Sequence, residues 1–262
     1  MSLTNKTPAE TYKDILTIEN NNSGVNGTNR IIKTGNGNES SLRISDRALL
    51  VKSTTDNTKA FDVQNSGGTT KFLVDTTNSY VKANGVFVNT QYAYFGVEAG
   101  QMSGIALGTH YALPFQNTVI SSGQNDVDFG TGTDPATTFT TADTDTQYAS
   151  QIVPMMWLVP DDISIDSVTA IEGADAATGD TTRLHLLSYT FTSGSTSCLT
   201  SGTLLAHNSD VTNAGNEQAY KTAFTIDSAA VAADKVILAF IRADSVNSDY
   251  SVNITVKYHI TG

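Results

Sequence analysis

The stretch KAFDVQNSGGTTKFLVDTTNSYVKANG, residues 59–85, decides how the first third of the chain folds. Phe61-x-Val63 is followed eleven residues later by Phe72-x-Val74, with Asn-Ser-Gly-Gly between the two pairs. Each pair lies in a run that alternates apolar with polar residues, which predicts a strand with one apolar face. Two strands alone are only marginally stable in water, so this face needs a further packing partner.

Similar short runs continue over residues 31–95, where apolar-x-apolar pairs recur about every 7 to 12 residues between Asp, Asn, Gly and Ser turns. Each unit is too thin to fold alone, which is typical of repeat architectures. One interpretation is a meandering sheet packed on a neighbouring domain. The interpretation that we favour is a fibre shaft in which three chains pool their apolar faces in one axial core. That core would contain Leu42, Ile44, Leu49, Val51, Phe61, Val63, Phe72, Val74, Val86 and Val88.

The composition predicts an all-β protein. Charged residues make up only 16% of the 262-residue chain, so the common helix formers Glu, Lys and Arg are sparse. Thr, Val, Ile, Tyr and Phe recur in short runs, which favours strands. We expect a short intertwined β-strand shaft followed by a carboxy-terminal, jelly-roll-like β-sandwich head.

Residues 148–262 contain seven strand candidates separated by turn signals, a pattern typical of a β-sandwich. The segment KVILAFI, residues 235–241, is apolar on both faces and predicts a central strand. Pro154 and Pro160 flank MMWLV and indicate an edge or bent strand. One face of the last strand is expected to carry Val252, Ile254, Val256 and Tyr258.

Charge divides the chain near residue 95. Residues 1–95 have a net charge of +2 and the remainder a net charge of −13. The first segment includes AETYKDILTIEN, which fits a helix or a strand equally well. The polar stretch over residues 121–150 either holds short strands around Val127 and Phe129 or wraps over a partner subunit. We expect an amino-terminal segment (1–30), a shaft (31–95), a neck (96–147) and a knob (148–262).

The overall charge of −11 argues against a nucleic-acid partner. Cys198 is the only cysteine, so the chain forms no internal disulfide. The opening MSLTNKTPAE lacks the apolar core of a signal peptide, and no apolar run is long enough to span a membrane. We expect synthesis in a cytosol, with the folded chain either released or retained there, and no membrane insertion.

The sequence indicates no catalytic residue, metal ligand or cofactor site. The four histidines are not spaced as a metal site requires, and the nucleophile-elbow, phosphate-loop and HExxH motifs are missing. DVDFGTGTD begins like a calcium loop, but Thr131 replaces the required glycine. We assign the clustered acids to turns and solvated surface: Asp126, Asp128, Asp134, Asp143, Asp145, Asp161 and Asp162.

Trp157 and the tyrosines leave two interpretations open. Aromatic rings can stack on a sugar, whereas a lone Trp within PMMWLVP more often belongs to a core or a subunit interface. We favour the core or interface for Trp157.

Two stretches carry a resemblance to known proteins. AFDVQNSGGTTKFLVDTTNSYVKANGVFV, residues 60–88, resembles the shaft repeats of bacteriophage tail fibres and related virion fibres. TYKDILTIENNNSGVNGTNRIIKTGNGNESSLRIS, residues 11–45, is similar to the amino-terminal region of structural proteins from marine phages, including cyanophages. The resemblance covers residues 8–90, whereas the head resembles fibre knobs in strand pattern only.

The resemblance implies a homotrimer in the virion, bound to other virion proteins through its amino-terminal segment. Its knob would attach to a host-surface glycan or envelope protein through residues that no motif identifies. A head fibre, capsid decoration protein or tail-knob component without receptor binding is the alternative. A glycan-cleaving tailspike is a remote alternative, because such enzymes usually need a long solenoid with a carboxylate-lined groove and this shaft is too short. We expect no enzymatic activity.

Overall fold

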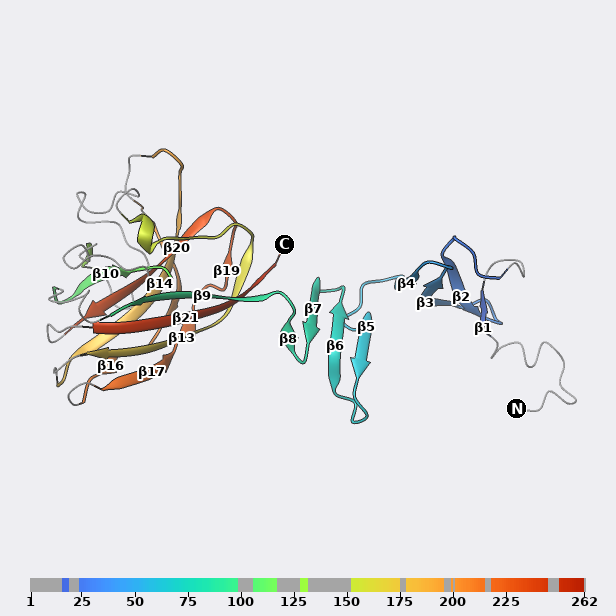
Figure 1. Cartoon of the computed structure of the whole chain (residues 1–262), viewed down its shortest axis with the longest axis horizontal. Helices are drawn as coiled ribbons and strands as arrows, with labels where there is room; N and C mark the ends of the chain where they lie inside the picture. The colour runs from blue at the N-terminus through green and yellow to red at the C-terminus, as the bar shows by residue number, and fades with distance from the viewer. Residues whose placement is uncertain are drawn as a thin grey trace, which may run out of the picture. The chain divides into compact units, whose positions relative to one another are not determined.

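The computed structural model of the chain describes residues 16–18, 24–98, 106–116, 128–131, 152–174, 178–195, 199, 201–214, 218–244 and 250–261 (Figure 1). The chain divides into two compact units, Met1–Val88 and Asn89–Gly262. The unit boundary falls within the uncharged stretch 83–97, so the charge asymmetry of the sequence follows the units.

The expectation of an all-β protein is confirmed, because the described residues form antiparallel strands and one three-residue 3₁₀ helix, η3 (Val153–Met155). The strands of the first unit are β1 (Leu16–Ile18), β2 (Arg30–Thr34), β3 (Glu39–Ile44), β4 (Leu49–Val51), β5 (Phe61–Gln64), β6 (Thr70–Asp75), β7 (Tyr80–Ala83) and β8 (Val86–Phe87). Those of the second unit are β9 (Thr90–Val97), β10 (Thr109–Leu113), β11 (Asp128–Thr131), β12 (Trp157–Leu158), β13 (Ile163–Ala174), β14 (Thr181–Thr190), β15 (Thr203–His207), β16 (Val211–Thr212), β17 (Ala219–Ala223), β18 (Thr225–Ile226), β19 (Ala230–Val231), β20 (Lys235–Ala243) and β21 (Tyr250–Ile260).

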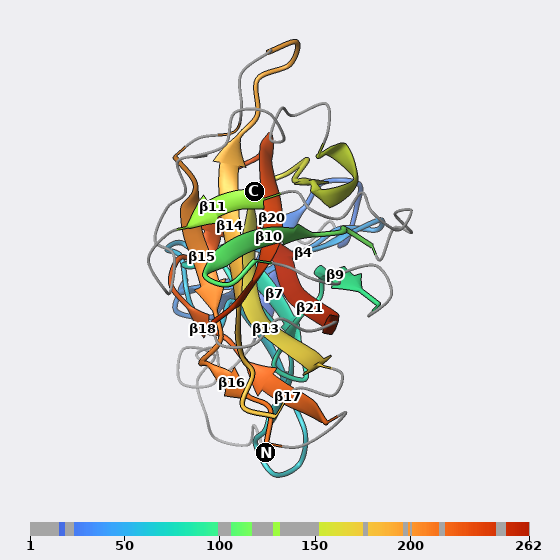
Figure 2. The ribbon, with the colours of Figure 1, turned by 90° about the vertical axis from the view of Figure 1, so that its left-hand side faces the viewer.

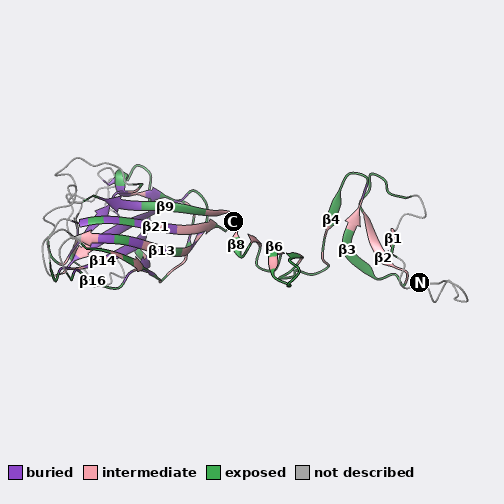
Figure 3. Ribbon diagram, turned by 60° about the horizontal axis from the view of Figure 1, so that its bottom comes forward, coloured by how far each residue is buried: buried purple, intermediate pink, exposed green. Residues whose placement is uncertain are grey.

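The first unit contains two separate four-stranded sheets, in the orders β1-β2-β3-β4 and β5-β6-β7-β8. Leu16–Ile18 forms a strand, which settles the helix-or-strand alternative for those three residues. The remainder of that expected element, residues 9–15 and 19–20, lies outside the described residues. In Figure 3 the strands of this unit are mostly exposed or half-buried, with little of the purple that marks buried residues.

The quoted stretch forms the second of these sheets. Phe61 lies opposite Val74 and Val63 lies opposite Phe72, so both Phe-x-Val pairs share one face. The rings of Phe61 and Phe72 meet edge to face, with their centroids 6.2 Å apart. Strand pairing extends the same face across β7 and β8.

Turn chemistry fixes the register of this sheet. The Asn65 side-chain oxygen accepts hydrogen bonds from the backbone N–H groups of Gly67, at 3.2 Å, and Thr69, at 2.8 Å. Between β7 and β8, Asn84 and Gly85 have φ values of 49° and 81°. Positive φ at both positions gives the two-residue turn whose twist matches that of antiparallel strands.

The second unit contains two sheets. One has the order β17-β13-β21-β9, with β19 paired to β13. The other has the order β11-β10-β20-β14-β15-β18, with β12 and β16 paired to β20 and β14. Strands β10, β20 and β14 of this second sheet lie side by side in Figure 2.

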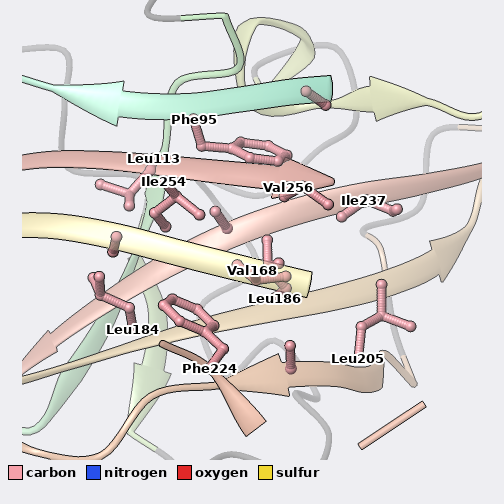
Figure 4. Packing of buried hydrophobic residues seen from close by; sticks show 14 of the residues in the cluster. Phe95, Leu113, Val168, Leu184, Leu186, Leu205, Phe224, Ile237, Ile254 and Val256 are labelled. Atoms are coloured by element: carbon pink, nitrogen blue, oxygen red, sulfur yellow. The ribbon is translucent and has the colours of Figure 1, made fainter. Parts of the chain in front are cut away.

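One apolar core joins the two sheets in a β-sandwich-like arrangement (Figure 4). Phe95, Val168 and Ile254 come from the first sheet, and Leu186 and Ile237 come from the second. Removing side chains of this size from water contributes about 1.5–3 kcal/mol each, so this core is the main source of stability in the unit.

Strand β20 is central and buried on both faces, as its apolar sequence predicts. Ile237, Ala239 and Ile241 belong to the core between the sheets. Its alternate residues face a second cluster that includes Phe129 and Met155. The expected strand around Phe129 is confirmed as β11, whereas Val127 lies outside the described residues.

The second unit includes strands from outside the expected knob. Strand β9 spans the expected boundary between shaft and neck, and β10 and β11 fall within the expected neck, yet all three pair with strands of the two sheets. Strand β9 pairs with β21 at eight successive positions, from Thr90 opposite His259 to Val97 opposite Val252. Short apolar runs do not show which distant strand they join, so composition alone placed this boundary too late in the chain.

Phe95 tests whether β9 belongs to the core of the second unit. We expect Phe95→Ala to lower the free energy of unfolding by about 3–5 kcal/mol, because it removes a fully buried ring. The measurement is urea unfolding followed by the fluorescence of Trp157, the one tryptophan of the chain.

Tyr94→Ala is the matched control, because Tyr94 is adjacent to Phe95 on the same strand but is 43% exposed. Its cost should stay below about 1 kcal/mol. Equal effects of the two substitutions would contradict the placement of β9 in the core.

Candidate functional site

An aromatic groove lies along strand β9 in the second unit. Its volume is about 370 Å³, within the range of small-molecule binding sites. It is lined by Tyr92, Ala93, Tyr94, Phe115, Gln116, Trp157 and Tyr258.

The alternation of β9 explains why tyrosines surround this groove. Ala93, Phe95 and Val97 point into the core, so Tyr92 and Tyr94 lie on the other face and remain 54% and 43% exposed. Strand β9 is also the edge strand of its sheet. Side chains at this edge therefore border both the core and the solvent.

A turn after β10 forms the opposite wall. Phe115 forms an isolated bridge with Phe95, and the Gln116 N–H donates to the Tyr94 carbonyl oxygen at 2.7 Å. Gln116 has a φ of 54°, a left-handed conformation that is uncommon outside glycine. These two contacts hold the Gln116 side chain at the border of the groove.

Trp157 anchors the base of the groove. Its ring stacks on Phe115 at a centroid distance of 6.0 Å and contacts Tyr258 at 4.9 Å. Trp157 is only 6% exposed and belongs to the core between the sheets, which is one of the two positions, core or subunit interface, that the sequence favours. Its position in the groove wall adds a second role that the sequence did not indicate.

The groove carries no charged side chain among its lining residues. Burial raises the pKa of Tyr258 above its ordinary value, so its phenol keeps its proton at neutral pH. The polar groups available to a ligand are therefore neutral hydroxyl and amide groups.

Nine of the ten expected core residues of the shaft lie on two sheet faces, and Val88 directly follows β8. Leu42, Ile44, Leu49 and Val51 share one face of the first sheet, because Leu42 pairs with Val51 and Ile44 with Leu49. Arg30 lies opposite Ile44 on that face. On the second sheet, pairing places the other expected residues of β5, β6 and β8 together with Val81 and Ala83: Phe61, Val63, Phe72, Val74 and Val86.

Seven of the ten are exposed in the single chain. Leu49 and Val88 are 66% and 56% exposed, and the remaining five lie between 38% and 44%: Leu42, Phe61, Val63, Phe72 and Val86. The structure therefore shows that each of the two sheets presents an apolar face to solvent in the single chain. Their burial in a trimer remains a prediction.

The opposite face of the β5–β8 sheet is closed by its own side chains. The Lys82 ammonium lies 4.4 Å from the ring centroid of Tyr80 and 4.2 Å from that of Phe87. The two rings meet edge to face at 5.4 Å. The two faces thus differ: one carries cation–π and aromatic contacts, and the other carries apolar groups open to solvent.

The described residues considered for catalysis or metal binding lie in pairs rather than in larger groups. Within the described parts of the chain, no three His, Cys, Asp or Glu side chains are grouped to hold a metal ion. His207 pairs with Asp227 at 2.7 Å and His259 with Asp166 at 2.9 Å. His110 and His185 are both buried, with ring centroids 5.1 Å apart. Of the other residues considered, Asp126, Asp134, Asp143, Asp145 and Cys198 lie outside the described residues.

Glu172 is a buried carboxylate between the two sheets that sequence analysis missed. It accepts hydrogen bonds from Asn208 Nδ2 at 2.7 Å, Thr222 Oγ1 at 3.1 Å and Thr182 Oγ1 at 3.2 Å. Asn208 Oδ1 in turn accepts the Leu184 N–H at 2.8 Å. Burial raises the pKa of Glu172 to about 7, against the lowering effect of these hydrogen bonds.

Signals for some of these missed residues exist in the sequence. Glu172 shares the parity of Val168 and Ala170, which places it on the inward face of β13. The Tyr-x-Tyr spacing of Tyr92 and Tyr94 likewise indicates a shared face. Gln116 carries no such signal, because its left-handed turn is not marked by glycine.

Comparison with known proteins identifies no family. No protein-family model matches the chain, and no curated protein matches it.

Among the helices in the described residues, none is long and apolar enough to cross a membrane.

Glu172 makes folding stability depend on pH. Its pKa of about 7 in the folded state exceeds its ordinary value of 4.5, so the folded state retains a proton that the unfolded state releases. Stability should therefore fall as pH rises from about 4.5 to about 7, by about 3 kcal/mol in total. Urea unfolding at pH 5 and pH 8 measures this loss.

Glu172→Gln is the control for that measurement, because the amide keeps the shape of the side chain and cannot ionise. The variant should lose less stability than the wild type between the two pH values. Parallel pH profiles of wild type and variant would exclude Glu172 as the titrating group.

Proposed function

We propose that the chain is a non-enzymatic virion fibre protein that forms a homotrimer through its first unit and attaches to a host cell through its second. The observation that carries the proposal is the apolar face of the β5–β8 sheet. Seven apolar residues share this face: Phe61, Val63, Phe72, Val74, Val81, Ala83 and Val86.

Exposure of this face is costly to a free chain. Phe61, Val63 and Phe72 are each about two-fifths exposed, at 43%, 44% and 38%. Burying the remaining surface of each side chain contributes on the order of 1 kcal/mol. Contiguous apolar surface of this kind is typical of an interaction site.

A second copy of the same chain provides a matching surface. The seven residues of the face are all uncharged, so no charge pattern selects a different partner, and the face can pack on the same face of another copy. Side-by-side copies would also cover β5 and β8, the edge strands of the described sheet. Three copies around one axis satisfy both requirements and agree with the resemblance to virion fibre shafts.

Trimer formation would make weak attachment effective. Three second units held together act as one multivalent ligand, which raises apparent affinity without a new contact. The net charge of −13 on the second unit opposes nonspecific binding to anionic cell surfaces. Attachment would then depend on a specific neutral site rather than on overall charge.

Leu49→Glu tests the assembly face. Leu49 is 66% exposed and shares its face with Ile44, so a carboxylate there would lie in the apolar interface of a trimer. We expect the dissociation constant of the trimer to rise more than tenfold. Size-exclusion chromatography with light scattering measures the resulting loss of trimer mass.

Leu50→Glu is the matched control on the next residue of the same strand. Leu50 lies on the opposite face, across from Arg43, where a carboxylate gains a charge partner. This variant should keep the wild-type mass. Equal masses for the two variants would contradict assembly through the Leu49 face.

Attachment is tested with the fluorescently labelled full chain on a panel of marine bacteria, cyanobacteria included. Saturable binding to some strains and not others supports host attachment. A stable trimer that binds no strain would instead favour a purely structural role in the virion.

A further inference from the structure

We infer that the aromatic groove along β9 is a binding site for neutral hexose units of a cell-surface polysaccharide. This inference deepens the attachment role proposed above and rests on it. It starts from the two exposed tyrosines, Tyr92 and Tyr94, beside a groove whose base is formed by Trp157.

The groove combines the two features that sugar recognition needs. A hexose ring presents a face of C–H groups that packs on aromatic rings, and hydroxyl groups at its edge that need hydrogen-bond partners. Tyr92, Tyr94 and Tyr258 supply rings with phenol hydroxyl groups, and Gln116 supplies an amide. Tyrosine suits such a site because one end of the ring is apolar and the other is polar.

Charge selects a neutral sugar. The lining residues carry no charge, and the second unit has a net charge of −13. Sialylated or sulfated glycans would meet repulsion without a cationic partner in the groove. Neutral hexoses meet no such repulsion.

Size and polarity argue against two other occupants. A volume of about 370 Å³ fits one or two sugar rings better than a protein surface, which requires a broad interface. The phenol hydroxyl groups and the Gln116 amide that line the groove would find no hydrogen-bond partner in an acyl chain. The occupant that remains is a short neutral saccharide.

Part of the groove is held in place before any ligand binds. The Phe115 N–H donates to the Pro154 carbonyl oxygen at 2.9 Å, and the Trp157 ring contacts the rings of Phe115 and Tyr258. A rigid aromatic surface loses little conformational entropy on binding, which favours affinity for a small ligand.

Trp157 makes the inference directly testable, because it is the only tryptophan and it lines the groove. The full chain is titrated with maltose, cellobiose, lactose, mannobiose and chitobiose, and then with sialyllactose as an anionic probe, while tryptophan fluorescence is recorded. We expect a saturable change with at least one neutral disaccharide and none with sialyllactose.

Tyr92→Ala and Tyr94→Ala should each weaken that binding by at least tenfold. Ile171→Ala is the matched control, because Ile171 is a 56% exposed residue of β13 in the same sheet and does not line the groove. It should bind like the wild type, and all variants should keep the wild-type mass and unfolding curve.

Three results would overturn the inference: no response to any neutral disaccharide, a response only to sialyllactose, or unchanged binding in both tyrosine variants. The cell-attachment assay separates this failure from that of the proposed function. If the wild type and the tyrosine variants attach to cells equally well, the groove is not the site, although attachment itself stands. If the wild type attaches to no strain, the proposed function fails first.

Discussion

The structure of the first unit depends on one constraint: a four-stranded sheet has two faces, and the β5–β8 sheet covers only one of them with its own side chains. Lys82, Tyr80 and Phe87 contact one another on the covered face. The other face presents the two Phe-x-Val pairs. Thin sheets of this kind gain stability only when their apolar face leaves water, so the unit is better suited to association than to independence.

The second unit buries its apolar sheet faces within one chain. Its two sheets face each other across a shared core, and β20 adds a second apolar layer on its far side. The groove arises where this arrangement ends, because edge strand β9 has tyrosines on one face and core residues on the other. The second unit thereby presents an aromatic surface to solvent while its core stays buried.

The sequence predicted those features that depend on local alternation. The Phe-x-Val pairs, the doubly buried β20 and the shared face of Val252, Ile254 and Val256 follow from period-two patterns and are confirmed. The membership of β9 in the second unit was missed, because its partner β21 is more than 150 residues away along the chain. The groove was missed for a related reason: Tyr94, Gln116 and Trp157 meet only through tertiary packing.

The central claim is that the apolar faces of the first unit are buried against copies of the same chain. Sedimentation equilibrium of the unmodified protein at micromolar concentration tests it most directly. The account predicts a single species with three times the chain mass of 27.8 kDa. A species that remains at the mass of one chain, with the β5–β8 sheet still folded, would contradict it.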